Sequence, residues 1–192
     1  MKSFEQLSNY FYTLDEMYEK KCNEQSDINQ LLPTLKKYSE LCEHVTEMGV
    51  RWAVSTYALM IGKPKKFVSY DIVPLEDFRV SLDFLLLLAK NNNIDYSFIV
   101  ADTLNVEIDE TDFLFIDTYH TYKQLKRELE LHASKVKKFM GFHDTTTYGL
   151  VGEDGDYGLW NAIEEFLTEN KNWELCEKIE YNNGLTILKK IK

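Results

Sequence analysis

Residues that can bind cations or move protons follow several short apolar segments of this sequence. Carboxylates accept hydrogen bonds from hydroxyls and amines, and an imidazole can take up a proton near neutral pH. A histidine, His120, lies three residues beyond one of these carboxylates. The residues that follow the apolar segments are Asp71, Asp102, Asp117 and the adjacent pair His143 and Asp144.

The segment Glu47–Thr56 places an acidic residue and a glycine where a short apolar strand gives way to a helix. Gly49 permits a close backbone approach that a side chain would forbid, and the first amides of the helix are free to face a ligand. The carboxylate of Glu47 favours a ligand with an amine or hydroxyls over a pyrophosphate. The junction therefore predicts a cofactor site, although glycine in such a turn also serves as structural punctuation.

The elements that carry these residues alternate between strands and helices, which predicts an α/β fold with a mainly parallel sheet. Helical patterns cover Val54–Ile61, Leu75–Asn91 and Tyr119–Ser134. Because ligands of open α/β sheets bind outside the carboxyl ends of the strands, the acidic residues should meet in one crevice. The strands that precede them are Lys66–Tyr70, Tyr96–Val100, Asp112–Ile116 and Lys137–Phe142.

Both ends of the chain add to this core. Residues 1–44 read as a helical prefix, with apolar residues at three- and four-residue spacing from Phe4 to Leu14 and again from Ile28 to Leu41. We expect this prefix to cover one edge of the sheet; closure over a ligand is the alternative. Residues 45–192 form the core, so the prediction is a single domain of 192 residues.

The last third of the sequence predicts a loop, a helix and a hairpin. Thr145–Tyr157 is polar and contains several glycines, as active-site loops often do. A helix is expected from about Leu159 to Glu169. The Asn182-Asn183-Gly184 motif between two apolar segments is typical of a hairpin turn, so the sheet should end with an antiparallel strand.

Charge and hydropathy exclude several classes of protein. The net charge of −10 and the pI near 4.9 disfavour nucleic-acid partners, which are bound by neutralising phosphates. The sequence opens without a leader, and no apolar stretch approaches the roughly 18 residues of a bilayer span. We expect a cytoplasmic protein that does not insert into membranes, with homo-oligomer formation left open.

These motifs together resemble class I S-adenosylmethionine-dependent methyltransferases. The similarity is greatest to the group that contains cephalosporin-hydroxylase-like proteins and metal-dependent O-methyltransferases of rhamnosyl and macrolide sugars. It covers roughly residues 45–190 and implies a Rossmann-like methyltransferase fold. The stretches that carry it are EMGVRWAVST at 47–56, SYDI at 69–72, LFIDTYHTYKQLKREL at 114–129, GFHDT at 141–145 and GLWNAIEEF at 158–166.

The resemblance implies positions for the cofactor, S-adenosylmethionine. Glu47, Gly49 and Ser55 would line its methionine half. Asp71 would hold the ribose hydroxyls through charge-assisted hydrogen bonds, and Asp102 would lie near the adenine amino group. Ala53 departs from the family pattern, which more commonly has glycine at that position.

The resemblance also implies a divalent cation and a general base. Asp117 and Asp144 are the firmer cation ligands, with His143 where the related sugar methyltransferases usually have an acidic residue. An all-oxygen ligand set suits Mg²⁺, whereas one imidazole shifts the preference towards Mn²⁺, Fe²⁺ or Zn²⁺. His120 matches the histidine that takes the proton from the sugar hydroxyl. A backbone-bonded histidine at a helix start is the simpler alternative.

The sequence thus predicts an O-methyltransferase that uses S-adenosylmethionine and Mg²⁺ or Mn²⁺ to methylate a sugar hydroxyl of a glycan or glycosylated small molecule. One rival is a non-haem iron hydroxylase, since Asp117, His120 and His143 supply two imidazoles and a carboxylate. A second is a non-catalytic binding module with the same fold. An NAD-dependent enzyme is disfavoured because no GxGxxG motif follows the first strand.

Overall fold

The computed structural model describes residues 12–191. The predicted first helix therefore falls largely outside the described residues, because Phe4, Leu7, Tyr10 and Phe11 precede them. Within the described part of the chain, no helix is both long enough and apolar enough to cross a bilayer.

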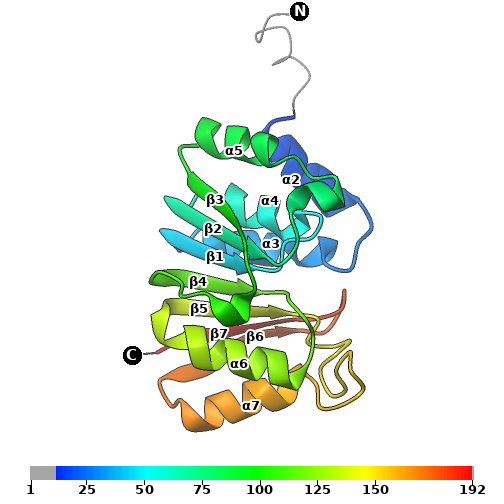
Figure 1. Ribbon diagram of the computed structural model, residues 1–192, viewed down its shortest axis with the longest axis vertical. Helices are drawn as coiled ribbons and strands as arrows, with labels where there is room; N and C mark the ends of the chain where they lie inside the picture. Colours follow the sequence, from blue (N-terminus) through cyan, green and yellow to red (C-terminus); the bar gives the residue numbers. More distant parts are fainter. Residues whose placement is uncertain (1–11, 192) are drawn as a thin grey trace, which may run out of the picture.

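Seven strands form one sheet in the order β3-β2-β1-β4-β5-β7-β6 (Figure 1). The first five strands are parallel, and β7 is antiparallel to both of its neighbours. This arrangement confirms the predicted α/β fold and its C-terminal antiparallel hairpin. The strands are β1 His44–Met48, β2 Lys66–Asp71, β3 Asp95–Val100, β4 Thr111–Ile116, β5 Val136–His143, β6 Trp173–Ile179 and β7 Leu185–Lys190.

Helices cover both faces of the sheet, giving three layers (Figure 1). Two of them, α4 and α7, begin and end at the predicted residues. The α-helices are α2 Leu14–Asn23, α3 Leu32–Ser39, α4 Val54–Ile61, α5 Leu82–Asn91, α6 Tyr122–His132 and α7 Leu159–Glu169. Single 3₁₀ turns lie at η2 Asn29–Leu31, η3 Leu75–Phe78, η4 Thr103–Asn105 and η5 Ala133–Lys135.

The alternation of side chains along β4 divides the core between the two faces. Phe113 and Phe115 pack on the face covered by α2, α3, α4 and α5. Leu114 and Ile116 point to the opposite face, where α6 and α7 pack. Successive residues of a strand point to opposite faces, so a continuous apolar run marks a strand that is buried on both sides.

The helical prefix lies on a face of the sheet, so its predicted position along an edge is wrong. Both α2 and α3 pack against α4. The ring of Tyr38 in α3 lies 5.0 Å from Phe139 of β5 and 6.2 Å from Phe113 of β4. These aromatic contacts hold the prefix over the centre of the sheet.

The helix predicted over Leu75–Asn91 is interrupted. A 3₁₀ turn ends at Phe78, and Arg79 adopts a left-handed conformation with φ of 59°. The α-helix α5 begins only after Ser81, whose hydroxyl accepts a hydrogen bond from the Phe84 amide. A left-handed residue cannot continue a right-handed helix, so the apolar periodicity alone overestimated this helix.

The turn after β1 brings the backbone of two neighbouring strands together. Gly49 has a φ of +85°, and a Cβ at this position would lie 1.9 Å from the carbonyl oxygen of Asp117. The Asp117 amide in turn donates to Met48 O at 2.8 Å. Glycine is therefore required at position 49 by both its torsion and the space available.

We predict that Gly49→Ala destabilises the protein by about 3 kcal/mol or more, because it adds a backbone clash to the strain of a positive φ. The matched control is Gly155→Ala. Gly155 has a φ of +79° with no atom near its Cβ position, so its substitution should cost about 1 kcal/mol. Urea denaturation of both variants measures the difference, and equal losses would contradict the steric explanation.

Candidate functional site

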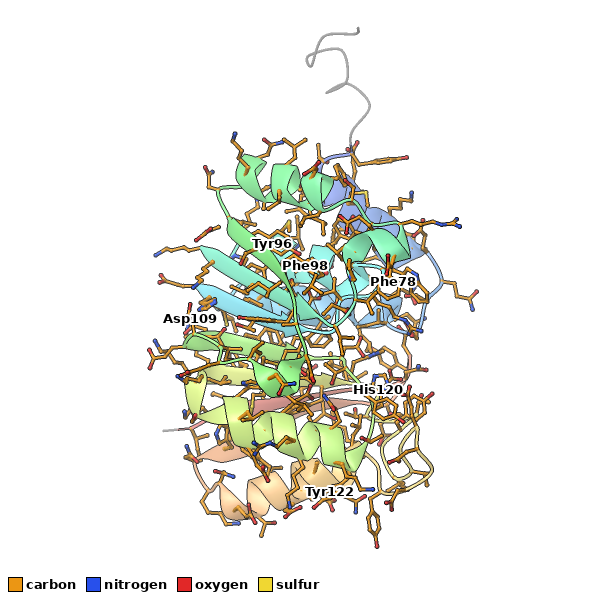
Figure 2. All side chains as sticks on the ribbon, viewed as in Figure 1. Phe78, Tyr96, Phe98, Asp109, His120 and Tyr122 are labelled. Atoms are coloured by element: carbon orange, nitrogen blue, oxygen red, sulfur yellow. The ribbon has the colours of Figure 1, made fainter. Side chains whose placement is uncertain are left out.

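A cavity of about 510 Å³ lies at the carboxyl ends of the parallel strands. Figure 2 shows His120 and Phe78, which both line it, on one side of the molecule, and Asp109 on the opposite side. The cavity wall also includes Asp27 and Ile28 of the prefix. A prefix that closes over a ligand, the alternative to one that only covers the sheet, would have to contribute to this wall. Of the predicted site residues, the cavity is lined by Gly49, Ser55, Asp71, Asp102, Asp117, His120 and Asp144.

Glu47 does not line the cavity. Its side chain is fully buried between β1, β2 and α4, where the hydroxyls of Ser55 and Ser69 donate to it at 2.6 and 2.7 Å. The Thr56 hydroxyl lies 3.0 Å from the second oxygen. Burial raises the pKa of the Glu47 carboxyl to about 7, although these hydroxyls oppose the rise. Glu47 reaches the cavity wall through Ser55.

Asp71 organises the loop that follows β1. One of its oxygens accepts hydrogen bonds from the amides of Val50 and Arg51, at 2.8 and 3.0 Å. The other accepts from the Val73 amide at 2.9 Å. Because a carboxylate offers about four acceptor positions, little capacity remains for a ligand. A ligand hydroxyl would bind the remaining position or compete with the loop.

The backbone conformation of Ala53 explains why glycine would suit this position, as the family pattern implies. The residue is fully buried and adopts a left-handed conformation, with φ of 58°, immediately before α4. It shapes the loop but does not contact the cavity.

Asp102 caps η4, accepting from the Leu104 amide at 2.9 Å and from the Asn105 side chain at 2.8 Å. Ala53 and Asp102 therefore both hold local backbone beside the cavity.

Three side chains converge at the end of the cavity nearest β4 and β5. His120 Nε2 lies 3.0 Å from Asp117 Oδ1 and 3.1 Å from Asp144 Oδ2. Asp117, His120 and Asp144 each offer a ligand atom within 4.8 Å of the other two. Asp117 and Asp144 are far apart in the sequence but meet here, because they follow adjacent parallel strands that end at the same edge of the sheet.

His143 lies against the same two carboxylates from the buried side. Its Nδ1 is 3.2 Å from Asp117 Oδ1 and 3.3 Å from Asp144 Oδ2. Its Nε2 is 3.1 Å from the backbone oxygen of Asp27, which fixes the ring orientation. The His143 side chain is 1% exposed, whereas that of His120 is 13% exposed and lines the cavity. Of the two histidines, only His120 therefore reaches the cavity, whereas His143 faces the two carboxylates from below the cavity wall.

The charges of this cluster stabilise one another. Burial favours neutral imidazoles, but Asp117 and Asp144 outweigh it, raising the pKa of His120 to about 9 and that of His143 well above its ordinary value. Burial also opposes ionisation of Asp117, yet the two histidines hold its pKa below the usual range. The two carboxylates thus attract positive charge from both sides.

Further residues complete the site. Glu153 Oε1 lies 3.0 Å from His120 Nδ1, and the Tyr148 ring stacks on His120 at 5.1 Å. Both belong to the polar segment after Asp144 that the sequence predicted as an active-site loop, although nothing in the sequence singled out Glu153. Asn183 donates to Asp144 Oδ1 at 2.9 Å. Its sequence signal predicted a turn, and nothing in that signal indicated contact with the site.

No protein-family model matches this sequence, and no relative is found among curated proteins. Solved structures match its fold along nearly the whole chain. TomG, an O-methyltransferase of tomaymycin synthesis from Streptomyces achromogenes determined with S-adenosylmethionine, has a TM-score of 0.64 at 13% identity, covering 100% of both chains. The methyltransferase PaMTH1 of Podospora anserina, bound to S-adenosylhomocysteine, has a TM-score of 0.61 at 14% identity, covering 99% of this chain and 98% of that chain.

A third example is the O-methyltransferase from Bacillus cereus in complex with S-adenosylhomocysteine. Its TM-score is 0.58 at 13% identity, covering 97% of this chain and 96% of that chain. At such identities the likeness defines the fold alone. The chain has the Rossmann-like class I methyltransferase fold that its motifs predicted.

The buried Glu47 carboxyl makes stability depend on pH in a defined direction. In the folded protein Glu47 keeps its proton up to about pH 7, whereas the unfolded chain releases it near 4.5. The folded state therefore binds the extra proton between these values, so the contribution is fully present below pH 4.5 and is lost as pH rises through 7.

We predict that Glu47→Gln, which is neutral at every pH, removes this loss. Relative to the wild type, the variant should gain roughly 3 kcal/mol of unfolding free energy between pH 4.5 and pH 8. Denaturant titrations of both proteins at several pH values measure the gain. Parallel stability profiles would show that Glu47 is ionised in the folded state throughout.

Proposed function

We propose that this chain is an S-adenosylmethionine-dependent O-methyltransferase whose reaction requires a divalent cation. The observation that carries the proposal is one cavity with Asp71 and Asp102 at one end and the Asp117, Asp144 and histidine cluster at the other. The likeness to structures determined with S-adenosylmethionine or S-adenosylhomocysteine supports this use of the cavity.

The cofactor would occupy the first half of the cavity. Ser55 and the loop after Gly49 would hold its methionine part, and Asp71 a ribose hydroxyl, while Asp102 would lie near the adenine. Glu47 would act through Ser55, whose hydroxyl donates a hydrogen bond to the Glu47 carboxylate. When bound, S-adenosylmethionine supplies an electrophilic methyl group. The protein's own part is to align that group with the acceptor hydroxyl.

The donor set at the second half fits a divalent cation. Ligand atoms in adjacent octahedral positions, about 2.1 Å from a cation, are about 3.0 Å apart. His143 Nδ1 lies 3.2 Å from Asp117 Oδ1 and 3.3 Å from Asp144 Oδ2, which is close to that spacing. We assign Asp117, Asp144 and His143 as ligands, which favours Mn²⁺ over Mg²⁺. The Nε2–H group of His143 can donate to the backbone oxygen of Asp27, as the second ring nitrogen of ligating histidines commonly does.

His120 is the proposed general base. It alone of the two histidines reaches the cavity, and Glu153 accepts from its Nδ1. Its Nε2 faces Asp117 and Asp144, and a cation bound there would offset their negative charge, so that the neutral ring could take up a proton at Nε2. A cation beside Asp117 and Asp144 would place positive charge near a bound hydroxyl and favour its ionisation. The imidazole would then accept the hydroxyl proton. Tyr148 keeps the ring in place by stacking against it.

A sugar hydroxyl suits the charge and the walls of the cavity. Trp52 and Tyr119 line it with half-exposed rings, which offer flat faces to a sugar. Arg51 is the one arginine or lysine among the described lining residues, so phosphate-bearing acceptors such as acyl-CoA would be repelled even with a cation present. The acidic lining residues are Asp27, Asp71, Asp102, Asp117, Asp144 and Glu153.

A hydroxylase that holds iron at Asp117, His120 and His143 is the main alternative. The cluster supplies the residue types, since both histidines approach Asp117 Oδ1. The likeness to methyltransferase structures favours methyl transfer. The two reactions differ in their need for O₂, because only the hydroxylase consumes it.

We predict that the wild type binds S-adenosylhomocysteine and that Asp71→Ala weakens binding by about 1.5–3 kcal/mol, roughly 10- to 150-fold. The reason is the loss of a charge-assisted hydrogen bond and of the loop that Asp71 holds. Calorimetric titration measures the affinity. Asp109→Ala is the control, since Asp109 is exposed at the opposite end of the sheet and pairs with Lys66. A wild type that binds neither cofactor form at millimolar concentration would refute the proposal.

We predict different effects for the two histidines of the cluster. His143→Gln should weaken Mn²⁺ binding at least tenfold, because it removes a ligand. His120→Gln should keep Mn²⁺ binding within a few fold but reduce turnover about a hundredfold, because glutamine cannot accept the proton. Electron paramagnetic resonance of free Mn²⁺ measures binding, and S-adenosylhomocysteine release measures turnover.

Two outcomes would change this assignment. Loss of Mn²⁺ binding in His120→Gln alone would make His120 the ligand and leave the base elsewhere. Full turnover of the wild type after chelation would remove the cation from the reaction. The same assay without oxygen separates the rival, because methyl transfer continues anaerobically and hydroxylation stops.

A further inference from the structure

The hairpin turn Asn182-Asn183-Gly184 contacts the site from a distant part of the chain. All three residues have positive φ values, of 52°, 67° and 93°. The Asn183 carbonyl accepts hydrogen bonds from the amides of Thr146 and Thr147, at 2.9 and 3.1 Å. A Cβ at Gly184 would lie 2.3 Å from Thr146 Oγ1. The turn is therefore packed tightly against the segment that follows Asp144.

The Asn183 side chain selects which oxygen of Asp144 faces the cluster. Its Nδ2 donates to Asp144 Oδ1 at 2.9 Å. Asp144 Oδ2 is left facing His120 Nε2 and His143 Nδ1, at 3.1 and 3.3 Å. The Asp144 side chain is 5% exposed, so water has little access to replace this donor. The amide thus fixes the carboxylate in one orientation.

Asn182 makes a separate contact with the cavity wall. Its Oδ1 accepts from the Gln30 amide and its Nδ2 donates to Ser26 O, both at 2.8 Å. These bonds bracket Asp27 and Ile28, which line the cavity. One turn therefore holds the Asp144 carboxylate through its second residue and the prefix through its first.

We propose that Asn183 is a positioning residue that presents Asp144 Oδ2 to the divalent cation, whereas Asn182 positions the cavity wall. The inference rests on the cation site of the proposed function. Partners that orient a metal ligand typically contribute 10- to 100-fold to metal affinity. Asn183 touches neither the cation site's ligand oxygen Oδ2 nor the cavity, so its effect passes entirely through Asp144.

The test compares Asn183→Gly with Asn182→Gly. Both positions have positive φ, which glycine adopts freely, so each variant removes an amide while keeping the turn. Mn²⁺ binding is measured by electron paramagnetic resonance of the free ion, together with thermal melting. Asn183→Gly should bind Mn²⁺ 10- to 100-fold more weakly. Asn182→Gly should weaken it by only a few fold, because its link to the cluster runs indirectly, through the backbone from Ser26 to Asp27 and from Asp27 O to His143 Nε2.

A second measurement separates the two roles. Hydrogen exchange of the Gln30 amide, which donates to Asn182, should accelerate in Asn182→Gly and stay unchanged in Asn183→Gly. Asn183→Ser shortens the side chain and removes the amide without adding charge, so it should also weaken Mn²⁺ binding and serves if the glycine variant fails to fold.

Three results would overturn the inference. Wild-type Mn²⁺ affinity in Asn183→Gly would show that the amide does not orient Asp144. Equal losses in both glycine variants would assign the effect to the turn as a whole. A wild type that binds no Mn²⁺ would remove the proposed cation site itself and the inference with it, whereas the first two results leave that site intact.

Discussion

The candidate site depends on holding two carboxylates, Asp117 and Asp144, close together at the edge of a parallel sheet. Like charges in a partly buried place repel, so each needs compensation. His120 and His143 approach both carboxylates from opposite sides, within 3.0 to 3.3 Å. The same arrangement that lets two imidazoles stabilise the pair also creates a place of strong attraction for a cation. The surrounding loops keep these four side chains in their positions relative to one another.

Two acidic groups of this protein, the fully buried Glu47 and the partly exposed Asp117, show how environment separates structural from chemical roles. Glu47 is surrounded by hydroxyls without a positive partner, so burial raises its pKa and the side chain works as a hydrogen-bonded tie between β1, β2 and α4. Asp117 lies one strand away with two histidines, and its pKa is lowered. Glu47, which only hydroxyls surround, supports the cavity wall, whereas Asp117, which two histidines accompany, faces the cavity.

The architecture and the crowding of acidic residues at one edge were predictable from local patterns. Apolar runs of strand length, separated by helical periodicity, are enough to predict parallel strands, and the residue after each run must then lie at the carboxyl edge. That argument correctly brought Asp71, Asp102, Asp117 and Asp144 to one cavity. It failed where a single torsion decided the outcome, as at Arg79, which divides the predicted helix.

The sequence by itself determined the fold class and which acidic residues share an edge, because strand direction and side-chain alternation are local properties of the chain. Only the tertiary structure decided that Glu47 turns away from the cavity, that the helical prefix supplies part of its wall, and that Asn183 holds Asp144. Asn183 and Asp144 are 39 residues apart in the sequence, and Asn182 and Ser26, which also share a hydrogen bond, are 156 residues apart. Such contacts depend on how β7 returns beside β5 and on how the prefix packs over the sheet, which no local pattern encodes.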